Sequence, residues 1–225
     1  MHDQPEQLSL GLDLPTGYRA SDFLTSPCNA VARAWIERWP DWPATALLLF
    51  GPPGAGKTHL ARIFADETGA RILSGENLPM ALDPPSWMMW RTHVIEHADR
   101  MADEESLLHL YNGAREMGGH LLLTSRWPLS AWSLKLPDLR SRLRTAPVVG
   151  IDTPDDAVLA AVLIKLFDDR QLRVDEAVVL YLVQRMERSF AEARRVVAAL
   201  DDLALRTKRR IGVTLAREAL GWRES

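Results

Sequence analysis

The chain has 225 residues, of which 47% are hydrophobic and 25% charged, so it suits a soluble globular protein of one large or two small domains. A net charge of −3 gives no global basic field for nucleic acid, and a single cysteine, Cys28, excludes an internal disulfide and suits a reducing cytosol. The N-terminal residues lack the basic and apolar regions of a secretory signal, and no apolar run approaches the ~20 residues of a membrane span.

Residues 1–17 are interpreted as a flexible tail, because Pro5, Pro15 and Gly17 interrupt any regular pattern. The tail contains alternating leucines in the run Gln7-Leu8-Ser9-Leu10-Gly11-Leu12. One interpretation is an edge strand packed on the body of the protein, which the tail by itself favours. The other is a linear docking peptide, in which a glutamine hydrogen bond and leucine anchors enter the apolar pocket of a partner.

A helix is expected after residue 29, because apolar residues follow at helical spacing: Ala30, Val31, Ala34, Trp35 and Trp39. Asp41-Trp42-Pro43 ends this helix. The aromatic stripe is interpreted as core.

The run Gly51-Pro52-Pro53-Gly54-Ala55-Gly56-Lys57-Thr58 has the pattern of a phosphate-binding loop, G-x-x-x-x-G-K-[ST]. The apolar strand expected at residues 45–50 precedes it, and an apolar helical pattern follows, which is the context that the motif requires. Glycines let backbone amides point inward, and the helix N-terminus adds partial positive charge. Lys57 is expected to reach the outer phosphates and the Thr58 hydroxyl to ligate Mg²⁺, with His59 next to them at the nucleotide site.

Further strands are expected at residues 70–73, 92–97, 120–124 and 146–151, with a helical turn within 76–82 and a helix capped by Asp103 between them. Strands that alternate with helices predict an α/β fold, with a parallel sheet covered by helices on both faces.

From residue 153 onward the pattern is helical only. Thr153-Pro154-Asp155-Asp156 is expected to start a helix with a capping hydroxyl, Asp175 a second, and the capping box Ser189-Phe190-Ala191-Glu192 a third, before a short helix at 214–220. We therefore divide the chain into a tail (1–17), an α/β nucleotide-binding domain (18–152) and a small helical domain (153–225).

Glu96 ends an apolar strand and is the candidate for holding Mg²⁺ together with Thr58. The alternative is a plain buried strand with an exposed glutamate. The next position often carries the carboxylate that activates water, but here it is His97, which predicts weak self-hydrolysis. His93 and His97 are four residues apart on a strand, so zinc is not favoured.

Two other polar groups are candidates. Thr124 ends a predicted strand and is placed to sense a γ-phosphate, because the carboxyl ends of parallel strands face the ligand crevice. Arg140, Arg142 and Arg144 occupy alternate positions and form either a solvated basic face or an arginine finger that reaches a neighbour's nucleotide. Trp127 and Trp132 are interpreted as loop packing.

A P-loop α/β domain, a helical lid and a trans-acting arginine together resemble the AAA+ family. Three runs are similar to segments of the replication initiator DnaA and its regulatory relatives: residues 18–23 with Asn29, which would cover adenine, Thr124-Ser125-Arg126 as sensor I, and residues 139–143 as box VII. The tail run is similar to the sliding-clamp-binding peptide of a DnaA-related regulator.

The resemblance implies an AAA+ module with ADP or ATP and Mg²⁺, bound by Gly51–Thr58, His59, Glu96 and Thr124. It implies that Gln7, Leu8, Leu10 and Leu12 enter the DNA polymerase III β sliding clamp, and that Arg142 is the finger that completes the ATP site of DnaA. It implies no sequence-specific DNA binding, a cytoplasmic location and negative regulation of replication initiation, and it leaves a homo-oligomer open.

Two positions depart from the family pattern. His97 follows Glu96, and the sensor II arginine falls at Ala191, where Arg188, Arg194 or Arg195 could substitute. Two rival functions remain: an autonomous AAA+ ATPase such as a helicase-loader-like motor, and a small-molecule kinase, against which the box VII-like run argues.

Overall fold

A computed structural model describes residues 20, 23–78 and 89–222 of the chain. Its first half is built on a five-stranded sheet in the order β2-β3-β4-β1-β5, with all strand pairs parallel. The strands are β1 (Ala46–Phe50), β2 (Arg71–Ser74), β3 (His93–Glu96), β4 (Leu121–Ser125) and β5 (Val148–Gly150). All five expected strands are present, and the prediction of an α/β sheet domain is confirmed.

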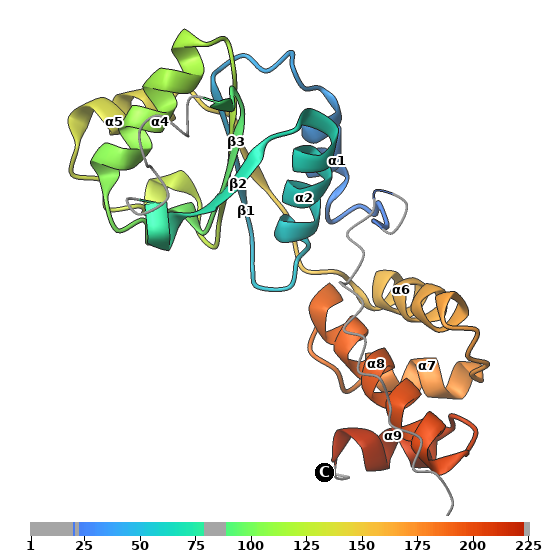
Figure 1. The fold of residues 1–225 in the computed structure, drawn as a ribbon. Helices are drawn as coiled ribbons and strands as arrows, with labels where there is room; N and C mark the ends of the chain where they lie inside the picture. Colours follow the sequence, from blue (N-terminus) through green and yellow to red (C-terminus); the bar gives the residue numbers. More distant parts are fainter. Residues whose placement is uncertain (1–19, 21–22, 79–88, 223–225) are drawn as a thin grey trace, which may run out of the picture.

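Helices cover both faces of this sheet (Figure 1). One face carries α1 (Ala30–Glu37) and α2 (Lys57–Thr68), and the other carries α4 (Glu104–Glu116) and α5 (Pro137–Leu143). The described residues of the domain also include the short 3-10 turns η2 (Gly75–Asn77), η4 (Ala98–Arg100) and η5 (Leu129–Ala131). Part of the helical turn expected within 76–82 is present as η2, and residues 79–82 lie outside the described residues.

The two cores follow from side-chain alternation along the central strand. Leu47 and Leu49 join the core under α1 and α2, whereas Ala46 and Leu48 join the core under α4 and α5. Because successive residues of a strand point to opposite faces, a strand buried on both sides is apolar throughout, as β1 is.

The second half is a helical lid with a core of its own (Figure 1). It comprises α6 (Asp156–Asp169), α7 (Glu176–Val183), α8 (Phe190–Thr207) and α9 (Val213–Leu220). The prediction of a small all-α domain after the sheet is confirmed. No described helix is both long and apolar enough to cross a membrane.

Helix starts were only partly predicted. Asp103 caps α4 as expected, accepting from the amides of Glu105 and Ser106. Thr153 is not the cap of α6: the Asp155 carboxylate accepts from the Val158 amide at 2.8 Å, so the helix begins two residues later. A carboxylate is at least as good a cap as a hydroxyl and complements the helix dipole.

The helix face expected to be core is only partly so: Trp35 and Trp39 are half-buried, Ala30, Val31 and Ala34 are exposed, and α1 buries Ala32 and Ile36 instead. Trp42 is buried and stacks on Phe64 with ring centroids 5.2 Å apart, while Trp35 and Trp39 pack against the same cluster. Trp127 departs from the prediction of loop packing, because 55% of it is exposed.

Candidate nucleotide-binding site

The phosphate-binding loop leaves the end of β1 and enters α2 directly. Gly54 and Gly56 have φ of +73° and +103°, a region that side-chain-bearing residues rarely adopt. Helix α2 begins at Lys57, so its first amides and its partial positive charge lie at the loop. The loop therefore has the backbone that a phosphate cradle needs.

Lys57 is held inside the loop. Its ammonium donates to the carbonyl oxygens of Gly51 and Pro52, at 2.7 and 2.8 Å. Burial lowers the pKa of Lys57, the nearby carboxylates of Asp99 and Glu96 act to raise it, and Arg126 lowers it. The lysine is thus positioned at the loop and surrounded by the charged groups of the site.

Two carboxylates lie near this lysine at the ends of neighbouring elements. Glu96 ends β3, and its Oε1 is buried without a hydrogen-bond partner among the described residues. Asp99 lies in η4, and its Oδ1 is likewise buried and unpaired in that part of the chain. Unpaired buried carboxylate oxygens are costly, which indicates that they serve a ligand.

Sequence reasoning missed Asp99 and considered His97 instead. His97 adopts φ +54°, its side chain is exposed, and its amide donates to the Thr124 hydroxyl at 3.3 Å. This left-handed residue turns the chain so that the carboxylate two positions later comes near Lys57. The sequence shows that an acid, Asp99, follows three residues after Glu96. It does not show the turn at His97 that brings this acid back toward Lys57.

These residues fit a magnesium ion. No group of three or more His, Cys, Asp or Glu side chains in the described ranges is arranged to hold a metal by itself. Mg²⁺ does not need one, because it usually takes one or two carboxylates together with substrate phosphates and water. The hydroxyl of Thr58 and the unpaired oxygens of Glu96 and Asp99 are the groups that would hold it.

Thr124 is buried at the end of β4, where its hydroxyl accepts the His97 amide. The next but one residue, Arg126, has an exposed side chain, and its amide donates to Asp99 Oδ2 at 3.1 Å. The ends of β3 and β4 are thus joined through η4. This arrangement brings the predicted Thr124 and Glu96 to the same edge of the sheet as the loop.

The lid contacts the loop. The amide of Phe190 donates to the carbonyl of Gly54 at 3.0 Å, and a Cβ on Gly54 would lie 2.5 Å from that of Ser189. The Ser189 hydroxyl caps α8 by accepting the Glu192 amide, but the Glu192 carboxylate pairs with Arg195, so only half of the expected capping box forms. The start of α8 is therefore fixed against the nucleotide loop.

The structure separates the three arginines considered for sensor II. Ala191 lies against Gly54 but carries no cation. Arg188 pairs with Asp156 at 2.9 Å, and Arg195 pairs with Glu192. Arg194 alone of the three has a recorded contact with the sheet domain, through a 3.1 Å hydrogen bond to His59.

His59, in the first turn of α2, is buried and contacts the lid. Its Nδ1 accepts from Arg194, since a guanidinium can only donate, and the ring of Phe23 meets it edge-on at 5.2 Å. Phe23 and Phe190 also approach Gly56. Asn29, in contrast, bonds to Leu24 and Ser26 and shapes the turn before α1.

Arg142 lies away from this site. It projects from α5, on the sheet face opposite α2, and its Nε donates to the Asn112 side chain of α4 at 2.9 Å. The peptide Gln7, Leu8, Leu10 and Leu12 lies outside the described residues.

Two family models match the chain. Residues 47–106 match the ATPase family associated with various cellular activities (AAA), and residues 155–220 match the lid domain of Hda. The chain belongs to the AAA+ family. Its lid is of the Hda type, and Hda is a DnaA-related AAA+ protein.

Solved structures of AAA+ proteins share the fold. Domain III of the Thermotoga maritima replication initiation protein DnaA is similar with a TM-score of 0.79 and 17% identity, over 91% of this chain and 95% of that one. AMPPCP-bound DnaA from Aquifex aeolicus has a TM-score of 0.71 and 15% identity, over 88% of this chain and 71% of that one. The RuvB Holliday junction branch migration motor of Thermotoga maritima has a TM-score of 0.64 and 19% identity, over 85% of this chain and 66% of that one.

Proposed function

We propose that this AAA+ protein binds ADP or ATP with Mg²⁺ and regulates replication initiation by stimulating ATP hydrolysis on DnaA. The observation that carries the proposal is the position of Arg142. Its side chain projects from α5, which covers the sheet face opposite α2, and it donates to the Asn112 side chain. An arginine placed there is suited to a neighbour's nucleotide.

The chemistry in trans is electrostatic. Charge develops on the phosphoryl oxygens as the bond to the γ-phosphate breaks, and a guanidinium from a second protein neutralises it. Arg142 supplies that cation, while the Gly51–Thr58 loop would hold this protein's own nucleotide as a structural ligand, with Glu96 and Asp99 on its Mg²⁺. The Hda-type lid supports DnaA as the partner.

The tail supplies the second contact. In this proposal an apolar pocket of the DNA polymerase III β sliding clamp takes up the side chains of Gln7, Leu8, Leu10 and Leu12. ATP hydrolysis by DnaA is then stimulated only where a clamp is loaded on DNA. The test measures ATP hydrolysis by DnaA with clamp-loaded DNA and either the intact chain or a Gln7→Ala/Leu8→Ala variant. We expect the variant to lose both clamp binding and clamp-dependent hydrolysis, and Ser9→Ala to retain them. Unchanged hydrolysis with the double variant would exclude clamp docking.

A second function is favoured by one observation. Asp99 places a second carboxylate near Lys57, although the position after Glu96 is a histidine. An autonomous ATPase would use such a carboxylate to activate water. That function predicts sustained ATP turnover by the purified protein alone, abolished by Lys57→Ala. The regulator predicts that turnover appears only when DnaA is added.

A further inference from the structure

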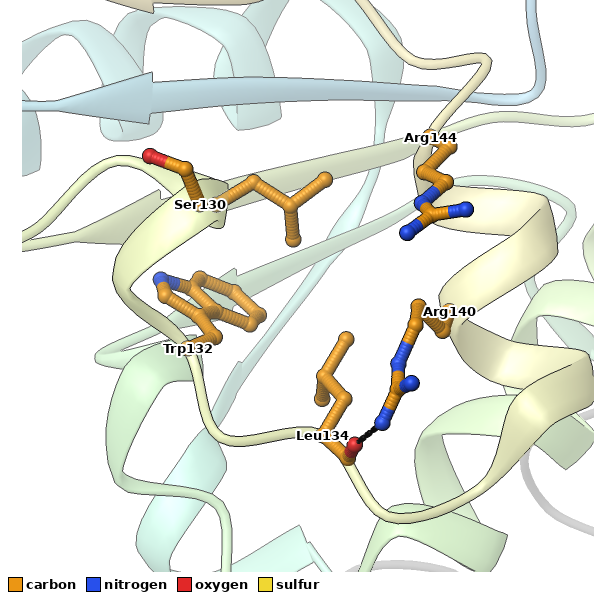
Figure 2. A pocket seen from close by; sticks show the side chains of 6 residues that line it. Ser130, Trp132, Leu134, Arg140 and Arg144 are labelled. Carbon is orange, nitrogen blue, oxygen red and sulfur yellow. Dashed lines mark hydrogen bonds between the residues drawn. The ribbon is translucent and has the colours of Figure 1, made fainter.

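A pocket of about 530 Å³ lies between η5 and α5, outside the nucleotide site. Figure 2 shows Trp132 on one side and the side chains of Arg140 and Arg144 on the other, with Leu134 between them. Leu129 and Ser130 complete its lining. The pocket therefore combines an apolar wall with two cations.

The two arginines are not compensated by acids within the described residues. Arg140 donates to the Leu134 carbonyl, and Arg144 has no recorded side-chain hydrogen bond or ion pair in the part of the chain that the structure describes. They are four residues apart on one helix, where like charges repel. Two guanidiniums kept together beside apolar side chains indicate an anion site.

Local charge points the same way. Residues 126–145 contain five basic residues and one acidic one, a net charge of +4, although the whole chain carries −3. A negatively charged partner would therefore be attracted to this segment and repelled by the rest, which carries −7.

We propose that this pocket binds an acidic side chain of the partner ATPase together with a neighbouring apolar side chain. A volume of about 530 Å³ exceeds what a simple anion fills, and the Trp132 and Leu134 wall requires an apolar group as well. The indole N–H of Trp132 already donates to the Trp127 carbonyl, so the ring offers the pocket its apolar part. Tryptophan and arginine are among the residues enriched at the centres of protein interfaces.

A protein fits the pocket better than a nucleic acid strand does. Arg140 and Arg144 are the two cations among its lining residues, because Arg142 is on the other side of α5 and bonded to Asn112. A strand binder needs a track of successive phosphate contacts. The inference rests on the proposed function, since the pocket and Arg142 share α5 and both would contact the same partner.

The test separates affinity from catalysis. Arg140→Gln/Arg144→Gln removes both charges and keeps side-chain amides that can donate, and we expect it to raise the half-saturating concentration for stimulating DnaA about tenfold without changing the maximal rate. Ser130→Glu, which places a carboxylate in the pocket, should act in the same direction. Arg142→Ala should instead lower the maximal rate. Lys208→Ala/Arg210→Ala removes two lid charges and serves as the control.

Direct binding of AMPPCP-bound DnaA to the ADP-bound chain completes the test, with thermal unfolding to confirm that each variant is folded. Weaker binding by both pocket variants supports the inference. If both pocket variants bind and stimulate DnaA as the intact chain does, the inference about the pocket is wrong and the proposed function stands. If the intact chain itself does not bind DnaA, both are wrong. Loss of binding to a 20-nucleotide oligothymidine, with DnaA binding intact, would reassign the pocket to nucleic acid.

Discussion

The amide of Phe190, at the start of lid helix α8, donates a hydrogen bond to the carbonyl of Gly54 in the phosphate loop, with 3.0 Å between nitrogen and oxygen. This bond joins the two domains at the point where nucleotide would bind. A change at Gly54 therefore affects the loop and the lid together.

Gly54→Ala should weaken nucleotide binding and destabilise the protein. Its φ of +73° costs a side-chain-bearing residue about 1–2 kcal/mol, and the new Cβ would lie 2.5 Å from that of Ser189. Gly69→Ala is the matched control, because it has φ +68° with nothing within 4 Å. We expect similar backbone strain in both variants, measured by thermal unfolding, but loss of ADP affinity in Gly54→Ala only. Equal ADP affinity in the two variants would show that the lid contact is irrelevant to binding.

Asp99→Asn should raise the Mg²⁺ concentration needed for nucleotide-induced thermal stabilisation roughly tenfold. The amide can still accept from the Arg126 backbone but no longer presents a charge near Lys57. His97→Asn is the control, because asparagine tolerates the left-handed conformation and the imidazole is exposed. If His97→Asn has the larger effect, the assignment of Asp99 is wrong.

Arg194→Gln should reduce affinity for ATP more than for ADP, by roughly fivefold, because its guanidinium reaches His59 beside the loop. Competition binding with labelled ADP measures both affinities. Arg188→Gln and Arg195→Gln, which break pairs with lid carboxylates, should leave the ratio unchanged. A change of the ratio in either of them would move the sensor role away from Arg194.

Stability should fall as the pH is lowered from about 6.5 to about 4. Burial, with a smaller contribution from Arg71, lowers the pKa of His93 from 6.5 to about 4, and burial also lowers that of His120. The unfolded chain therefore takes up these protons at higher pH than the folded one, and His93 costs up to about 3 kcal/mol of unfolding free energy over that range. Urea unfolding at pH 7 and pH 4.5 should show that His93→Leu removes most of the loss, whereas His109→Leu, on an exposed position, does not. A pH dependence unchanged in His93→Leu would contradict this account.

The sequence predicted the parts of the site that depend on local pattern. A glycine-rich loop between an apolar strand and a helix indicates a phosphate-binding loop. The positions of Glu96 and Thr124 follow because the carboxyl ends of parallel strands lie at the same edge of a sheet. Asp99 did not follow, because its position depends on His97, a non-glycine residue in a left-handed conformation.

The arginine run shows a second limit of sequence reasoning. Alternate positions would share one face on a strand, but residues 137–143 form a helix, where Arg142 lies on the side away from Arg140. The proposed finger, Arg142, therefore lies on a different side of the helix from the pocket cations, Arg140 and Arg144. The lid posed the same difficulty, since Arg194 reaches His59 from one turn beyond the expected position, Ala191.

The most direct test of the account is single-turnover hydrolysis of ATP bound to DnaA, with the ADP-bound chain on clamp-loaded DNA. Arg142→Ala should reduce the stimulated rate by about a thousandfold, as expected for loss of an arginine finger, and Arg142→Lys should not restore it fully because the forked geometry is lost. Arg115→Ala, on the neighbouring helix α4, should leave the rate unchanged. A stimulated rate that survives Arg142→Ala, with binding intact, would contradict the central claim.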